Sequence, residues 1–76
     1  MSLAKLPSRT RGRVTCVRVD HDLSRRLMEM GLIEGTEVQV VRRAPFGDPL
    51  QIRVGDYDLS LRTSEAELID VTRVRG

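Results

Sequence analysis

The stretch DHDLSRRLMEMGLIEGTEVQVVRR, residues 20–43, decides the fold because its hydrophobic period changes halfway along. In the first half, Leu23, Leu27 and Met30 fall at positions i, i+4 and i+7, which is the spacing of one helical face. Gly31 follows, and glycine is favoured at the left-handed position just beyond a helix. These positions predict a short helix that ends at Gly31.

The second half of this stretch has the alternation of a strand. After the predicted helix, Leu32 falls where a Schellman closure would fold it back against the last helical turn. Gly35 then suits a tight turn, since glycine adopts positive φ without steric cost. In residues 36–43 the side chains of Val38 and Val40 fall on one face, which predicts a half-buried strand.

The segments on either side supply further strands and few helical residues. Gly55 begins a two-residue turn of the kind that joins the strands of a hairpin. Residues 63–67 fit one helical turn, with Ser64 and Glu67 as a capping box. The predicted strands are residues 13–19, 36–43, 50–54, 57–61 and 69–71. The predicted fold class is therefore all-β, a small closed or nearly closed barrel with one short helix after the first strand and a helical turn before the last.

The length and composition limit the classes of protein to which this chain can belong. Seventy-six residues predict one domain over residues 1–76, with a core over about residues 9–74 and frayed ends. Cys16 is the only cysteine, so a disulfide framework is excluded. No run of apolar residues is long enough to span a bilayer, so we expect a cytoplasmic protein with no direct membrane insertion. The net charge is +2 with scattered basic residues, and no nucleic-acid partner is expected.

The sequence offers little for catalysis and one weak candidate for a metal. His21 is the only histidine and the glycines stand singly, so no catalytic residue is predicted and the protein is not expected to be an enzyme. Asp20, His21 and Asp22 combine carboxylate and imidazole donors, which suit Fe²⁺ or Zn²⁺. Consecutive residues do not easily face one ion, and helix capping is the alternative role for these aspartates. Weak binding of Fe²⁺ or Zn²⁺ is left open, and no other cofactor is expected.

The loop APFGDP, residues 44–49, offers a candidate surface for a partner protein. Phe46 lies at its tip, where an aromatic ring either folds back onto the barrel or docks onto another molecule. Folding back is the more common outcome, and docking is the alternative. Turns and the segments beside this loop supply the other candidate contact residues, and the predicted partner-binding set is Leu32, Arg42, Arg43, Phe46 and Asp48.

The run RRLMEMGLIEGTEVQVVRRAPFGDPLQIRVGDYDLSLRTSEAELIDV, residues 25–71, resembles the ferrous-iron transport protein A (FeoA) family. The resemblance lies in the helix, the GLI-x-G-T turn, the APFGDP loop, the hairpin and the SLR-x-SEA segment in that order. Glu34 stands where many family members have proline. The resemblance implies an SH3-like β-barrel, a cytoplasmic location and a role in bacterial ferrous iron uptake.

The same resemblance implies a partner. It points to an accessory protein that binds and modulates the FeoB membrane permease through the cytosolic part of the permease. The alternative is a transition-metal-binding SH3-like regulatory domain akin to the C-terminal domain of metal-dependent repressors. A nucleic-acid-binding barrel is a third reading, disfavoured by the scarcity of aromatic residues for base stacking. Weak self-association is left open.

Overall fold

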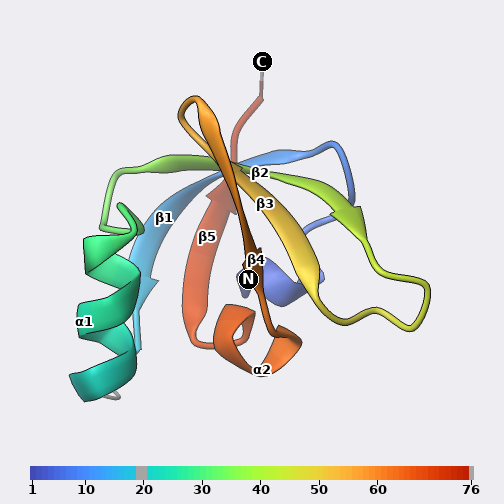
Figure 1. Cartoon of the computed structure of the whole chain (residues 1–76). Coiled ribbons are helices and arrows are strands. Elements are labelled where there is room, and N and C mark those ends of the chain that lie inside the picture. Colours follow the sequence, from blue (N-terminus) through green and yellow to red (C-terminus); the bar gives the residue numbers. More distant parts are fainter. Residues whose placement is uncertain (19–20, 76) are drawn as a thin grey trace.

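The computed structural model of the chain describes residues 1–18 and 21–75, with residue 21 described in its backbone. Five strands and two short α-helices follow a single 3-10 turn at the start of the chain (Figure 1). In chain order the elements are η1 (Leu3–Lys5), β1 (Arg11–Val17), α1 (His21–Glu29), β2 (Glu37–Arg43), β3 (Leu50–Val54), β4 (Tyr57–Leu61), α2 (Thr63–Ala66) and β5 (Ile69–Arg73). The predicted class, mostly β with a helix after the first strand and a helical turn before the last, is confirmed.

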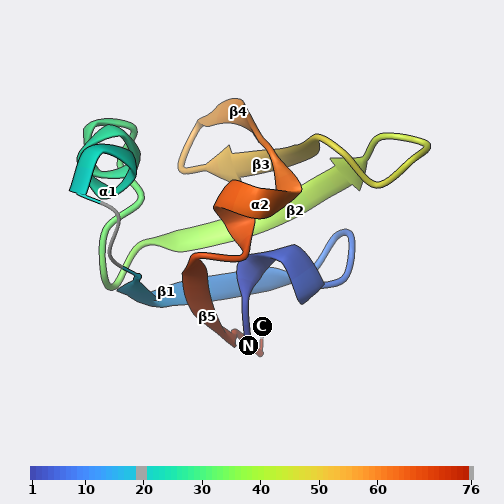
Figure 2. The same cartoon turned by 90° about the horizontal axis from the view of Figure 1, so that it is seen from below.

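The five strands form one antiparallel sheet that is strongly curled but not closed. The strand order is β4-β3-β2-β1-β5, so β4 and β5 form the two edges. The sheet bends where the register shifts between Val40 and Arg42 on β2 and between Val14 and Cys16 on β1, because a bulge increases local twist. Figure 2 shows α2 and the N-terminal turn lying across the open side of the curled sheet. These two segments cover the opening that closure of the barrel would have removed.

The core lies inside the curl and follows the predicted alternation. Val38, Val40, Leu50, Ile52 and Val54 are all buried, and their outward neighbours are more exposed. From the rest of the chain, the core gains a further set of apolar side chains: Leu3, Leu6, Val14, Leu27, Leu32, Leu61, Ala66, Ile69 and Val71. The hairpin turn also matches its prediction, since Gly55 has a φ of 61°.

The end of α1 forms the closure that its sequence predicts. Gly31 has a φ of 86°, and its N–H donates to the carbonyl of Met28 at 3.0 Å. The N–H of Leu32 donates to the carbonyl of Leu27 at 2.9 Å, which completes a Schellman motif. The motif turns the chain back so that Leu27 and Leu32 both reach the core.

The expectation of frayed ends and of a core that begins near residue 9 is wrong. Leu3 and Leu6 are both 0% exposed, and the N–H of Val71 donates to the carbonyl of Met1 at 2.8 Å. At the other end, the N–H of Val74 donates to the carbonyl of Arg11 at 3.0 Å. The open sheet leaves apolar surface that these terminal segments cover, and local sequence pattern carries no sign of that need.

Two local predictions differ from the structure. The first strand spans Arg11–Val17 rather than residues 13–19, and Val19 lies outside the described residues. The capping contact of α2 is made by Glu65, whose Oε1 accepts the N–H of Arg62 at 2.9 Å, and not by Ser64 with Glu67. The N-cap is Arg62 rather than Ser64, so both capping positions lie two residues earlier than the sequence suggested.

Candidate functional site

The loop between β2 and β3, residues 44–49, is closed by its own backbone. The N–H of Gly47 donates to the carbonyl of Ala44 at 2.7 Å, and the N–H of Ala44 donates to the carbonyl of Pro49 at 3.1 Å. Gly47 has a φ of 84°, which a residue with a side chain rarely adopts. These contacts give the loop a defined shape.

Asp48 fixes this loop to the rest of the molecule. Its Oδ1 accepts the N–H of Thr63 at 2.8 Å, at the start of α2. The Thr63 hydroxyl lies 3.0 Å from the carbonyl of Gly47 and 3.2 Å from the same Oδ1. A carboxylate at a helix start is favourable because the first N–H groups have no partner within the helix. Asp48 therefore stabilises the loop, and its role as a partner contact stays a prediction.

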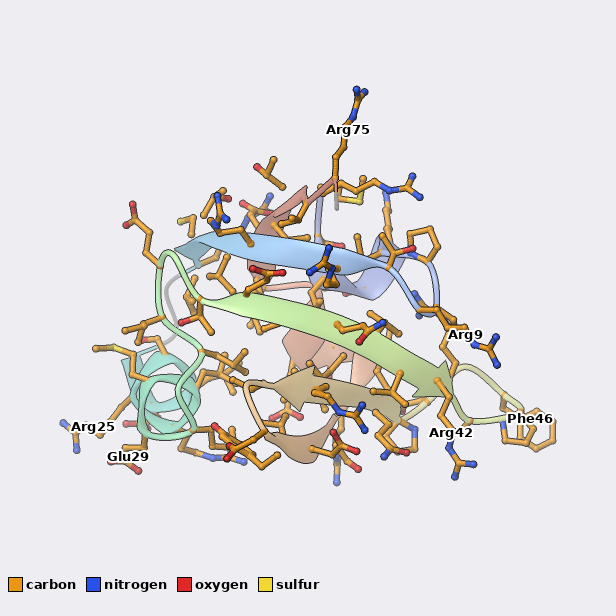
Figure 3. All side chains as sticks on the ribbon, turned by 90° about the horizontal axis from the view of Figure 1, so that it is seen from above. Arg9, Arg25, Glu29, Arg42, Phe46 and Arg75 are labelled. Carbon is orange, nitrogen blue, oxygen red and sulfur yellow. The ribbon has the colours of Figure 1, made fainter. Side chains whose placement is uncertain are left out.

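Phe46 projects from this fixed loop into solvent. Its side chain is 99% exposed, and Figure 3 shows the ring beyond the end of β2, away from the body of the protein. The expectation that the ring folds back onto the barrel is therefore wrong. The loop bonds hold Ala44 and Gly47, which flank Pro45 and Phe46 at the tip of the loop. A fully exposed aromatic ring on an anchored loop has the form of an interaction anchor.

The two arginines at the end of β2 have different surroundings. Arg42 is exposed, and Figure 3 shows it at the same end of the molecule as Phe46. Arg43 turns inward, and its Nη2 donates to the carbonyl of Leu6 at 2.6 Å. Arg43 therefore ties the N-terminal segment to β2, whereas the Arg42 side chain is exposed at the end of the molecule where Phe46 lies.

Leu32 belongs to the predicted partner-binding set, but it does not lie on the surface. Its side chain is 0% exposed and belongs to the core. The Schellman closure that fixes the end of α1 also buries Leu32, and it leaves the following residue, Ile33, exposed. The exposed apolar side chain at this turn is therefore Ile33 rather than Leu32.

A shallow groove between α1 and β1 was not anticipated from the sequence. It encloses about 530 Å³ and is lined by Thr15, Cys16, Val17, Ser24, Met28, Ile33 and Glu34. The side chain of Met28, which lines this groove from α1, is 59% exposed. The helical period predicts this exposure, because Met28 is rotated by about 100° around the helix axis from Leu27, which lies on the buried stripe.

The predicted metal ligands fall largely beyond what the structure describes. Asp20 and the side chain of His21 lie outside the described residues, and Asp22 is exposed in the first turn of α1. Among the described residues, no three His, Cys, Asp or Glu side chains lie close enough together to hold a metal ion. The metal site at these three residues stays a prediction.

One ion pair on the outer face of the β3–β4 hairpin shifts the titration of both its members. Arg53 Nε lies 2.8 Å from Asp58 Oδ1, and Gln51 donates to the other carboxylate oxygen at 3.0 Å. The hydrogen bond from Arg53 lowers the pKa of Asp58, and the bond to Asp58 raises the pKa of Arg53. The pair joins neighbouring strands and stands apart from the Phe46 loop.

Comparison with known proteins places the fold in a family context. The family model of the FeoA domain matches residues 1–73. The FeoA protein of Chlorobium tepidum is 38% identical with a TM-score of 0.93, and the alignment covers 100% of this chain and 72% of that one. The Stenotrophomonas maltophilia FeoA, described as an SH3 domain protein and solved with zinc, is 38% identical with a TM-score of 0.84, covering 95% of this chain and 89% of that one. The SH3-like fold class is confirmed by these structures.

A curated relative joins this kind of domain to a transporter. A Fe²⁺ transport protein A/Fe²⁺ transporter FeoB fusion protein of Porphyromonas gingivalis is 43% identical over 47 residues, which are 62% of this chain and 6% of the relative. The chain thus spans a small part of that protein.

A manganese-dependent transcriptional repressor shares the fold alone, at 17% identity and a TM-score of 0.90, over 97% of this chain and 36% of that one. None of the described helices is long and apolar enough to cross a membrane. The match of the family model over residues 1–73, together with relatives at 38% identity over nearly the whole chain, shows that this chain belongs to the FeoA domain family.

Proposed function

We propose that this chain is a cytoplasmic accessory protein of ferrous iron uptake, which binds the cytosolic part of a FeoB-type permease and modulates it. The Porphyromonas gingivalis fusion supports the pairing, because it holds an FeoA region and an FeoB transporter in one chain. Covalent linkage raises the effective concentration of two modules for each other. Separate chains need a contact surface of adequate affinity instead.

The observation that carries the proposal is the complete exposure of Phe46 on an anchored loop. Burying a phenylalanine side chain contributes about 1.5–3 kcal/mol, which is roughly a tenfold to 150-fold change in affinity. The hydrogen bonds of Asp48 with Thr63 hold the loop before binding, so little further ordering is required when a partner binds. Arg42 adds a positive charge at the same end, which favours an apolar pocket with a carboxylate-rich rim on the partner.

The proposal is tested with purified protein and the detergent-solubilised permease. We expect Phe46→Ala to weaken binding by about tenfold or more while thermal unfolding is unchanged, since the ring makes little contact with the fold. Arg42→Ala should slow association and make it less sensitive to salt. Met28→Ala, an exposed apolar residue on α1, is the matched control. Equal binding of the wild type and Phe46→Ala would refute the role of this loop.

The functional consequence is measured separately from the binding. In cells that keep the permease, loss of this protein should lower ferrous iron uptake, and Phe46→Ala should behave like the loss. The resemblance to the FeoA family implies that the cytosolic part of the permease contains a GTP-binding domain, so GTP turnover with and without the protein reports modulation directly. If neither uptake nor turnover changes, the accessory role is wrong even where binding is observed.

A second candidate function, metal binding, is favoured by the zinc present in the Stenotrophomonas maltophilia relative. Asp20, His21 and Asp22 are the residues of this chain proposed to hold Fe²⁺ or Zn²⁺. Anaerobic calorimetric titration of the wild type and His21→Ala with each ion tests the proposal. Affinity weaker than about millimolar, or affinity that His21→Ala leaves unchanged, would exclude this site.

A further inference from the structure

The end of the molecule where β1 begins and β5 finishes carries a hollow lined mainly by arginine. The hollow encloses about 530 Å³. Its lining consists of Arg9, Thr10, Arg11, Arg73, Val74 and Arg75. Four of the six lining residues are arginines and none carries a carboxylate, in a chain whose net charge is only +2.

The antiparallel pairing of β1 with β5 gathers these residues from both ends of the chain. Gly12 lies opposite Arg73, and the N–H of Val74 donates to the carbonyl of Arg11 at 3.0 Å. The N–H of Arg9 donates to the carbonyl of Val40 at 2.6 Å, which holds the preceding turn against β2. The sheet therefore sets the backbone positions of Arg9, Arg11 and Arg73.

The charges of this hollow are only partly neutralised within the protein. Arg11 forms an ion pair with Glu37 at 3.1 Å. Within residues 1–18 and 21–75, no carboxylate lies within 4.0 Å of a guanidinium nitrogen of Arg9, Arg73 or Arg75. Figure 3 shows Arg75 extending from the sheet into solvent and Arg9 beside the end of β2. Positive charges that line one hollow repel one another, and a bound anion relieves that repulsion.

We propose that this hollow binds a phosphate group, with the guanidinium groups of Arg9, Arg73 and Arg75 as its main contacts. A guanidinium presents paired N–H donors that match two phosphate oxygens, which makes arginine well suited to phosphate recognition. Because the hollow is open to solvent, the interaction is weak and depends on salt. The phosphate comes from a lipid headgroup or from a soluble phosphate compound, which present the same chemistry to the arginines.

Two probes applied to the untagged chain distinguish these sources. The first is inorganic pyrophosphate, titrated while the amide resonances of residues 9–11 and 73–75 are followed by NMR. The second is co-sedimentation with vesicles of phosphatidylcholine, with and without about one third of phosphatidylglycerol. Each arginine near an anionic membrane surface contributes about fivefold to binding, so Arg73→Ala/Arg75→Ala should weaken vesicle binding about 25-fold. Raising the ionic strength from about 0.1 M to about 1 M should abolish binding of either probe, because the Debye length falls from about 10 Å to about 3 Å.

Arg25→Ala/Arg26→Ala on α1 is the matched control, since it removes the same charge from exposed positions elsewhere. Arg73→Lys/Arg75→Lys keeps the charge without the paired donors and should weaken pyrophosphate binding less than the alanine pair. Binding of pyrophosphate alone assigns a soluble phosphate, and binding of anionic vesicles alone assigns a lipid headgroup. Absence of binding to both probes at millimolar concentration, or an equal loss in the α1 control, would overturn the proposal. Circular dichroism of each variant establishes that the fold is retained.

Discussion

Leu6 and Gly12 meet inside the core, and their contact provides a sharp test of how the N-terminal segment contributes to the fold. Leu6 is 0% exposed. A Cβ atom added to Gly12 would lie 3.1 Å from Leu6 Cδ2 and 3.2 Å from Val71 Cβ, which is tighter than ordinary contact. Glycine at this position of β1 thus makes room for the leucine. We predict that Leu6→Ala and Gly12→Ala are each destabilising but that each partly relieves the other.

The magnitudes follow from the packing. Removing the three carbons beyond Cβ from a buried leucine costs about 2–5 kcal/mol. Overpacking at Gly12 costs about 1–3 kcal/mol, reduced by the smaller backbone entropy that alanine has in the unfolded chain. In a chain that already carries Leu6→Ala, the Cβ that Gly12→Ala adds enters space that the leucine has vacated. The coupling energy between the two substitutions should therefore be about 0.5–2 kcal/mol in the favourable direction. The change in unfolded-state entropy caused by Gly12→Ala is the same with leucine or alanine at position 6, so it cancels from the double-mutant cycle.

The assay is urea unfolding of the wild type, both single variants and the double variant, followed by circular dichroism. Cores in chains of this size rarely supply more than about 3–5 kcal/mol, so Leu6→Ala approaches the limit of stability. Where it unfolds without denaturant, an osmolyte such as trimethylamine oxide restores the folded baseline for all four proteins. Met28→Ala is the control, because its exposed side chain contributes little to the core.

Two results would refute the reasoning. A change below about 0.5 kcal/mol for Leu6→Ala would mean that the N-terminal segment is frayed in solution, as the sequence alone suggested. Additive single effects in the double variant would mean that the two residues do not touch.

Three further predictions concern local contacts. Gly31→Ala should destabilise the protein by about 1–2 kcal/mol, because alanine is strained in the left-handed backbone conformation of Gly31. The loss should be larger still because the new Cβ would lie 3.0 Å from the hydroxyl of Tyr57, which donates to the carbonyl of Met30. Thermal unfolding measures the total loss. Asp48→Ala should cost about 0.5–2 kcal/mol, since it leaves the N–H of Thr63 without its acceptor, and the loop amides should exchange faster with solvent. Arg53→Ala should raise the pKa of Asp58 toward its ordinary value of 3.8, measured by carboxyl NMR titration.

The glycine and the loop aspartate predictions each have a control within the chain. Gly35→Ala carries a similar backbone cost at a φ of 91° but has open space around the new Cβ, so it should be less harmful than Gly31→Ala. Asp56→Ala removes an exposed carboxylate from the β3–β4 turn and should leave stability nearly unchanged. Equal losses for the two glycine variants, or for the two aspartate variants, would contradict the contacts assigned here.

The pH dependence of the Arg53 variant has a definite sign. The folded-state pKa of Asp58 is lowered, so the stabilisation by the pair is present above the ordinary pKa and is lost as the pH falls through the lowered one. The wild type and Arg53→Ala should therefore differ in stability near neutral pH and converge in acid. A constant difference across this range would show that the pair does not act through the charge of Asp58.

The sequence by itself determined the elements whose signals are local. The stripe of Leu23 and Leu27, the glycine after the helix and the alternation of Val38 with Val40 each depend on residues a few positions apart. The conformation of these segments follows from the 3.6-residue period of a helix and the two-residue period of a strand, and the structure contains each of the predicted elements. The family resemblance likewise rests on contiguous motifs, and the match to the FeoA domain confirms it.

Tertiary structure alone decided the features that join distant parts of the chain. The burial of Leu6 depends on β1 and β5, the capping of α2 depends on Asp48 in a loop 15 residues earlier, and the arginine hollow needs both ends of the sheet. The exposure of Phe46 also follows from that distant capping, because the loop is held in place without its aromatic ring. Contacts of this kind have no periodic signature in sequence, since they form only once curvature of the sheet has brought the segments together.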